Sequence, residues 1–199
     1  MSGRFPKPLL GLAALALLAG CETTTPTKVT RFNLGEPIAP AAVAITPRNP
    51  ADGGGLGFST TASAVSAELN RLGFTIAAPD DASTPLVAVV ALDVTTRPGP
   101  PRGPAFSVGI GGASFGRHTG FGGGVDVPVS RGRESYVDSS LLSVQLKRRA
   151  DSTVIWEGRA STFTDAGSPA DSPAALSQKL ATALFRDFPG ASGQTIMVK

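Results

Sequence analysis

Cysteine and histidine are almost absent from this sequence of 199 residues, which holds one of each, Cys21 and His118. A single cysteine excludes a disulfide within the chain. One histidine and one cysteine also fall short of the three or four nitrogen and sulfur ligands of a usual transition-metal site. The sequence therefore predicts no metal and no other cofactor.

Long apolar runs are scarce as well. The run at residues 9–19 is shorter than the roughly 20 apolar residues of a transmembrane helix, and the best later run, residues 85–94, contains an aspartate. Arg4 and Lys7 precede the first run and small residues follow it, which is the pattern of a secretory signal. We therefore expect export of the chain without a membrane-spanning helix.

Four residues, Leu18, Ala19, Gly20 and Cys21, resemble the lipobox of bacterial lipoproteins, in which a leucine and two small residues precede a lipidated cysteine. The resemblance implies that a diacylglyceryl group is attached to Cys21 and that residues 1–20 are removed as a signal peptide. It also implies that the new amino terminus receives a fatty acid such as palmitate. Two or more acyl chains hold a protein stably at a membrane.

Residues 21–28 are polar apart from the cysteine and have the composition of a short lipidated tether. Because Glu22 is not the aspartate associated with inner-membrane retention, we expect an outer-membrane anchor with the domain facing the periplasm. Loss of Arg4 and Lys7 leaves 16 of the 18 basic residues against 15 acidic ones. A mature net charge of about +1 argues against nucleic acid binding.

Two amphipathic helices are predicted in the remaining chain, residues 29–199, which we interpret as a single domain. Apolar residues four and three positions apart place the first at residues 58–72, followed by Gly73. Leucines four positions apart place the second at residues 173–188, before Pro189. The candidate N-caps are Ser59 or Thr60 for the first helix and Asp171 or Ser172 for the second.

Six strands are predicted from alternating or continuous apolar residues. Their ranges are 29–34, 41–46, 74–77, 86–94, 141–148 and 154–163. The fourth is almost wholly apolar, and we expect a central strand covered on both faces or nearly so. In the fifth, Leu142, Val144 and Leu146 are expected to face inward. These elements predict an α+β two-layer sandwich, with a mixed sheet of about six strands and both helices on one face.

A glycine-rich insertion, residues 103–129, separates the fourth strand from the fifth and holds nine of the 24 glycines. Glycine raises the entropy that is lost on ordering, which favours a mobile, solvent-exposed segment. Phe106, Val108 and Ile110 nevertheless alternate as in a strand. The alternative is therefore a segment that orders as a hairpin against a partner, a second copy or the membrane.

A possible catalytic serine lies in this insertion. Residues 112–116 match the G-x-S-x-G pattern of a hydrolase nucleophile elbow around Ser114. The elbow requires a helix after the serine, which the surrounding glycines disfavour. The elbow also requires an acidic residue and then a histidine after the serine. His118 lies four positions after Ser114, and no acidic residue stands between them. We therefore expect no enzyme, and keep as the alternative a hydrolase that uses Ser114 and His118, with Asp93 or Asp138 as a candidate acid behind the histidine.

Other polar candidates have simpler interpretations. Asp80 and Asp81 could form a calcium or acid–base pair, but a solvated turn is the simpler reading. Residues 147–149, with Arg131 and Arg133, could contact anionic lipid, or simply form a solvated strand end. Trp156 is expected to pack in the core.

Three stretches resemble the family of bacterial lipoproteins that share domain of unknown function 4136. They are the helix at residues 58–74 with its Gly-Phe ending, the valine-rich strand at 86–94, and the hairpin from Leu142 to the Trp-Glu-Gly-Arg-Ala of residues 156–160. The resemblance implies an envelope location and this α+β fold, and it transfers no catalytic residues. We therefore expect a lipid-anchored, non-enzymatic protein that binds another envelope protein or associates with itself.

Overall fold

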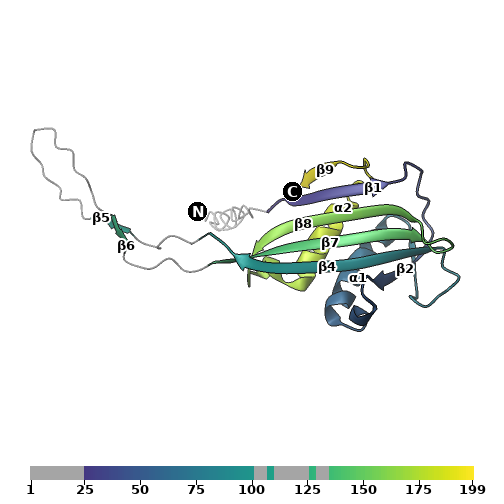
Figure 1. The fold of residues 1–199 in the computed structure, drawn as a ribbon, viewed down its shortest axis with the longest axis horizontal. Coiled ribbons are helices and arrows are strands. Elements are labelled where there is room, and N and C mark those ends of the chain that lie inside the picture. The colour runs from purple at the N-terminus through teal and green to yellow at the C-terminus, as the bar shows by residue number, and fades with distance from the viewer. Residues whose placement is uncertain (1–24, 101–106, 110–125, 129–134) are drawn as a thin grey trace, which may run out of the picture.

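The computed structural model of the protein describes residues 25–100, 107–109, 126–128 and 135–199. One mixed sheet forms the first layer of the fold, and two helices form the second (Figure 1). The sheet strands are β1 (Thr27–Asn33), β2 (Ala42–Pro47), β3 (Thr75–Ala77), β4 (Leu86–Pro98), β7 (Tyr136–Arg148), β8 (Val154–Asp165) and β9 (Thr195–Val198). Across the sheet they lie in the order β3, β2, β4, β7, β8, β1, β9. The predicted α+β sandwich is confirmed.

The sheet has seven strands where about six were predicted. The additional strand is β9, whose four residues are too few to show an alternating pattern. Two further strands, β5 (Ser107–Gly109) and β6 (Asp126–Pro128), pair with each other in a separate ribbon within the predicted insertion. What that segment contacts stays a prediction.

Pairing is parallel at one end of the sheet and antiparallel over the rest. β2 pairs in parallel with β3 and with β4, and the other neighbours are antiparallel. The pair β4 and β7 runs from Leu86 opposite Arg148 to Pro98 opposite Tyr136. Both strands are longer than predicted, because their distal halves carry threonines and serines rather than an apolar pattern. β4 thus extends well beyond β2, which ends opposite Val90.

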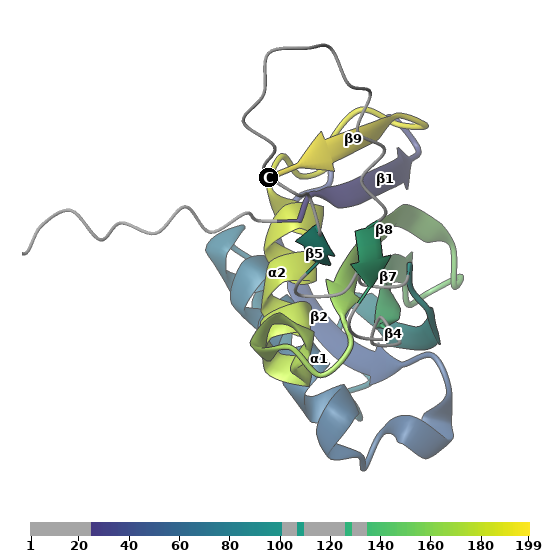
Figure 2. The same ribbon diagram turned by 90° about the vertical axis from the view of Figure 1, so that its left-hand side faces the viewer.

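Both helices cover the same face of the sheet, as Figure 2 shows. α1 (Leu56–Arg71) is followed by Gly73, whose φ of 91° suits glycine. α2 (Pro173–Phe185) begins as predicted, with Ser172 accepting a hydrogen bond from the Ala175 N–H. Two short 3₁₀ helices, η1 (Pro50–Asp52) and η2 (Pro169–Asp171), precede them. No helix in the described ranges is long and apolar enough to cross a membrane.

The predicted N-cap of α1 is wrong. The cap is Gly55, so the helix begins before Ser59 and Thr60, and both hydroxyls donate to the Leu56 carbonyl at 2.9 Å. The prediction started the helix at the first apolar residue of the repeat, Phe58, although the two residues before it are also helical. Gly55 offers no side-chain acceptor to the amides of the first turn.

The core lies between the helices and the sheet. Leu69 from α1, Leu184 from α2 and Leu142 from β7 are fully buried there. Trp156 is also fully buried, and its ring stacks on Phe185 with centroids 5.4 Å apart. Its indole N–H donates to the Pro189 carbonyl at 2.9 Å. The expected core position of Trp156 and the inward direction of Leu142, Val144 and Leu146 are confirmed.

β4 is a central strand, as predicted, but its two faces are not covered equally. Leu86, Ala88 and Val90 are buried against the helix layer, whereas the alternate residues are only half-buried. In the described part of the chain, the outer face carries polar groups, including ion pairs of Arg48 with Asp93 and of Arg159 with Glu157. The run of β-branched residues therefore indicated a central strand correctly. It did not indicate whether a second layer covers the outer face of the sheet.

Candidate functional site

The lipobox residues Leu18, Ala19, Gly20 and Cys21 lie outside the described residues, as do Ser114 and His118. Lipidation and the hydrolase alternative therefore stay predictions. The described part of the chain contains cavities and buried polar groups instead. Two places stand out, one at the start of the helices and one between them.

A cavity of about 670 Å³ opens where both helices begin against the distal half of β4, and we name it the helix-start cavity. Apolar groups form much of its wall, including Phe58 of α1, Val94 of β4 and Leu176 of α2. The loop after β2 closes one side. This position follows from the fold, because α1 and α2 both start at the end of the sheet where β4 and β7 outrun β2.

Asp138 of β7 lines the cavity and is only 8% exposed. Its Oδ1 atom has no hydrogen-bond partner, and neither has the Oγ atom of the fully buried Ser140 on the same strand. Ser140 lies directly opposite Val94, another residue of the cavity wall. A buried polar atom without a partner costs about 1–3 kcal/mol of stability. The cavity therefore presents an unused acceptor at its wall.

The charge of the cavity wall has one sign. Four aspartates line it, and no lysine or arginine is among its described lining residues. The aspartates are Asp52, Asp93, Asp138 and Asp171. Asp171 is occupied by bonds from the Thr164 hydroxyl and the Gly167 N–H, and Asp93 by its ion pair with Arg48. No group of three possible metal ligands occurs among the described residues. The wall therefore suits a hydrogen-bond donor or an organic cation, such as an ammonium or guanidinium group.

The rim of the cavity is unusually apolar for a surface. Leu56, the first residue of α1, is 87% exposed, and Val94 is 49% exposed. The neighbours of Leu56, Gly55 and Gly57, both line the cavity. Because Gly55 supplies no side-chain acceptor, the first amides of α1 also lack a side-chain cap. An exposed apolar side chain and the uncapped start of α1 thus lie beside the cavity.

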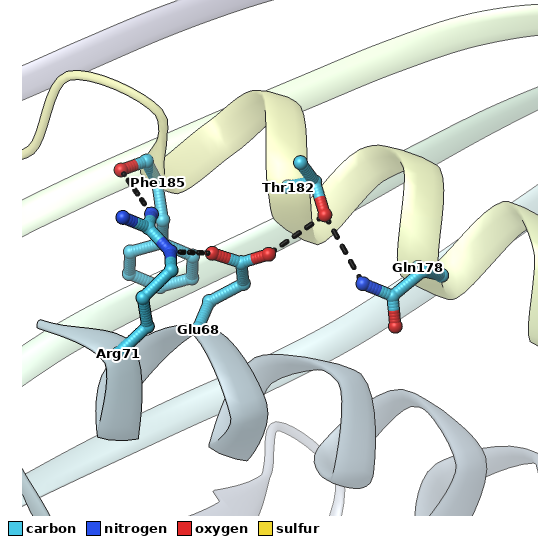
Figure 3. Close-up of polar contacts among 5 residues, drawn as sticks. All are labelled: Glu68, Arg71, Gln178, Thr182 and Phe185. Atoms are coloured by element: carbon cyan, nitrogen blue, oxygen red, sulfur yellow. Dashed lines mark hydrogen bonds and ion pairs between the residues drawn. The ribbon is translucent and has the colours of Figure 1, made fainter.

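The second place is a polar cluster between the helices (Figure 3). Glu68 of α1 is nearly buried, and its two carboxylate oxygens accept from Arg71 Nε at 2.8 Å and from the Thr182 hydroxyl at 2.7 Å. Gln178 donates to Thr182, and Arg71 donates to the Phe185 carbonyl near the end of α2. Since both oxygens of Glu68 are occupied, this cluster acts as a clamp between the helices.

A shallow basic groove of about 450 Å³ lies next to this clamp. Arg71, Lys179 and Arg186 line it, beside Thr27 at the start of β1. Burial lowers the pKa of the Lys179 ammonium, which donates to the Thr162 hydroxyl at 3.3 Å. The groove has no unpartnered buried atom among its described lining residues, so it is a weaker candidate than the helix-start cavity.

The remaining polar candidates from the sequence have structural roles. Asp81 accepts from the hydroxyl and N–H groups of Ser83, and these bonds lower the pKa of its carboxyl. It forms an exposed turn, as the simpler interpretation held. Arg148 pairs with Asp151 within the hairpin, and Arg149 donates to the Thr84 carbonyl. Arg131 and Arg133 lie outside the described residues.

Asp138 was missed by sequence analysis as a binding residue, although a signal for it existed. Leu142, Val144 and Leu146 were assigned to the inward face, and the same alternation places Ser140 and Asp138 on that face. A polar residue in an inward register is the expected mark of a functional or strained position. The prediction stopped at residue 141 because the apolar pattern stopped there.

The fold is that of a small α+β domain with an acidic, half-apolar cavity at one end. The chain belongs to the family described as a domain of unknown function (DUF4136), whose model matches residues 44–190. The family resemblance predicted from the sequence is confirmed. An uncharacterized protein of Zymomonas mobilis is 42% identical over 77 residues, which make up 38% of this chain. The match spans only 29% of that relative's length.

The solved structures that resemble this chain have lower sequence identity to it than the Zymomonas mobilis protein has. Two PelC dodecamer structures from Paraburkholderia phytofirmans are each 14% identical, with TM-scores of 0.38 and 0.39. The matches cover 79% of this chain and 92% and 93% of those chains. A PDZ domain protein from Parabacteroides distasonis is 12% identical with a TM-score of 0.47, over 87% of this chain and 39% of that one. At these TM-scores, nothing about partners is transferred.

Proposed function

We propose that this protein is a lipid-anchored component of the bacterial envelope, held at the outer membrane through Cys21, whose domain binds another envelope component without catalysis. The lipobox residues support the anchor. The observation that carries the binding role is the helix-start cavity with its unpartnered Asp138 oxygen. A hydrolase using Ser114 and His118 is the rival.

The cavity is better suited to binding than to chemistry. Its described wall holds no histidine, lysine or cysteine, so a base or nucleophile would have to be an aspartate. Two of the four aspartates are already engaged, Asp93 by Arg48 and Asp171 by Thr164 and Gly167. The hydroxyl of Thr61, which also lines it, is engaged with the Ser177 hydroxyl at 3.1 Å. An apolar pocket with a few directed polar groups is the usual form of a binding site.

A photoreactive residue in place of Leu56 tests this function in intact cells. Leu56 stands at the rim of the cavity and is 87% exposed, so its replacement should not disturb the core. We expect an ultraviolet-dependent product of higher mass. The matched control is the same residue in place of Met197, which is 61% exposed on β9 at the far edge of the sheet and should give none.

Asp138→Asn should then lower the yield of the Leu56 product several-fold, because the amide oxygen can still accept a hydrogen bond but no longer carries the negative charge that favours a cationic donor. The same change removes a buried, partly unsatisfied charge, so the melting temperature should stay equal or rise. Measuring both separates lost binding from lost folding. Equal products from Leu56 and Met197, or a yield indifferent to Asp138, would contradict a binding role for the cavity.

A further inference from the structure

β4 has an open edge beside the helix-start cavity. β2 pairs with β4 only as far as Pro47 opposite Val90, and the Arg48 N–H adds a bond to the Val90 carbonyl at 3.0 Å. β4 itself continues to Pro98. In the described ranges, no strand pairs with this side of β4 beyond Val90.

The backbone groups on this edge can be assigned. In a strand, successive residues direct their N–H and C=O groups to opposite edges. Val90 directs its carbonyl to the β2 side, whereas Gly99 donates on the β7 side at 2.7 Å. Leu92, Val94 and Thr96 share the parity of Val90, so their backbone groups point to the open edge. A further strand could form the same ladder that β2 forms upstream.

The side chains along this edge lead into the cavity. Leu92 and Val94 line it, and Thr96 lies directly opposite Asp138 across the β4 and β7 pair. A strand placed along the edge would direct every second side chain to the helix side, where the cavity lies. Ladder hydrogen bonds and side-chain insertion would therefore occur together.

We propose that the open edge of β4 and the helix-start cavity together bind an extended segment of an envelope protein as an added strand. Apolar side chains of that segment enter the cavity, and a lysine or arginine reaches Asp138. The inference rests on the proposed binding function and names its partner class. Backbone ladders supply affinity and alternate pockets supply selectivity in this form of recognition.

The chemistry of the edge supports this occupant over others. Exposed edges are usually blocked by charges, prolines or a covering element. Here proline stands only at the last position, Pro98, and the two charged residues, Asp93 and Arg97, alternate with Leu92, Val94 and Thr96, whose backbone groups point to the open edge. The wall contains aspartates without a lysine or arginine among its described members, so a basic side chain is favoured over an acidic one. An isolated metal ion or a small apolar molecule would leave the open ladder unused.

Val94→Pro tests strand addition, because it removes the N–H that points to the open edge and leaves the β7 ladder intact. Val94→Ala is the matched control, since it shortens the side chain but keeps the N–H. With the photoreactive residue at position 56, we expect Val94→Pro to lower the product yield at least tenfold and Val94→Ala at most about threefold. Thermal melting of each purified variant checks folding.

If Val94→Pro unfolds the domain, Thr96→Pro provides the same test farther from the core. Hydrogen exchange of the isolated product should also show protection at Leu92, Val94 and Thr96 relative to the free protein. Equal yields for proline and alanine, or unprotected amides, would overturn strand addition while leaving cavity binding in place. If the protein with the photoreactive residue at position 56 and no other change gives no product, both cavity binding and strand addition are overturned. A product containing only this chain would replace the partner with a second copy and overturn the assignment.

Discussion

Single residues decide how the core of this domain closes. Gly158 lies on β8 beneath Trp156, and a Cβ atom there would stand 2.7 Å from Leu184 Cδ1 and closer still to the indole ring. The side chains of Trp156 and Leu184 are fully buried, so neither can move away from an added Cβ atom without disturbing its neighbours. The glycine is therefore required by close approach, not by backbone conformation.

Gly158→Ala should lower the free energy of unfolding by about 1–3 kcal/mol, because it overpacks a filled core. Thermal or urea unfolding measures this loss. Gly54→Ala is the control, since a Cβ atom at Gly54 meets nothing within 4 Å. Equal stability of the two variants would mean that Trp156 can repack more freely than its burial indicates.

At this scale the sequence predicted apolar positions well and polar ones poorly. Trp156 and the inward leucines of β7 were placed correctly, because their burial follows from strand alternation. The lack of space for a side chain at Gly158 depends on the orientation of the Trp156 ring. The cavity beside Asp138 depends on where the two helices begin. Neither property belongs to a local pattern.

The helix pair is held by polar as well as apolar contacts. Glu68 joins α1 to α2 through Thr182, and Arg71 of the same helix reaches the Phe185 carbonyl (Figure 3). The Arg71 side chain is 53% exposed, whereas that of Glu68 is only 8% exposed. Thr182 is also exposed, so solvent reaches both partners of Glu68 and weakens each bond.

Thr182→Val should therefore destabilise the domain by about 0.5–1.5 kcal/mol, the ordinary net contribution of one hydrogen bond, because it removes a donor from Glu68 Oε1. Glu68→Gln should cost about 1 kcal/mol, and the double variant less than the sum of the two. Arg48→Gln, which breaks an exposed ion pair with Asp93, is the control and should change stability by less than about 0.5 kcal/mol. Additive effects at Glu68 and Thr182 would contradict the clamp.

Element boundaries followed the sequence only where apolar residues marked them. Both helices and six strands were found, and α2 starts at Pro173 as its cap predicted. Residues 95–98 of β4 and 136–140 of β7 were missed, because the apolar pattern ends before them and threonines and serines continue the strands. The β4 residues that line the helix-start cavity, 90–94, lie within the predicted strand, whereas Asp138 lies in the part of β7 that was missed.

For the whole molecule, the first question is attachment. Cys21→Ser should leave the precursor uncut by the lipoprotein-specific peptidase and abolish metabolic labelling with palmitate, because the thiol is the acceptor of the lipid. Thr23→Ser, two residues away, should be cut and labelled normally. Labelling that persists in Cys21→Ser would remove the anchor from the proposed function and leave the cavity experiments unaffected.

Strand order was beyond the reach of sequence reasoning. A hairpin was predicted between the strands that became β7 and β8, since a short polar turn links them. The placement of β1 between β8 and β9, and the parallel joining of β2 to β4, depend on pairing between distant segments. No local signal in the sequence specifies such partners.

The position of β1 has a consequence for when folding can occur. Its two neighbours, β8 and β9, are made last, and the hydroxyl bond between Thr30 and Thr195 joins residues 165 positions apart. Such high contact order slows folding, because a long loop must close before its contacts form. A chain that emerges from a translocation channel amino end first cannot complete this sheet edge until nearly all of it has crossed. If the chain is exported as proposed, the sheet can therefore close only after release from the channel.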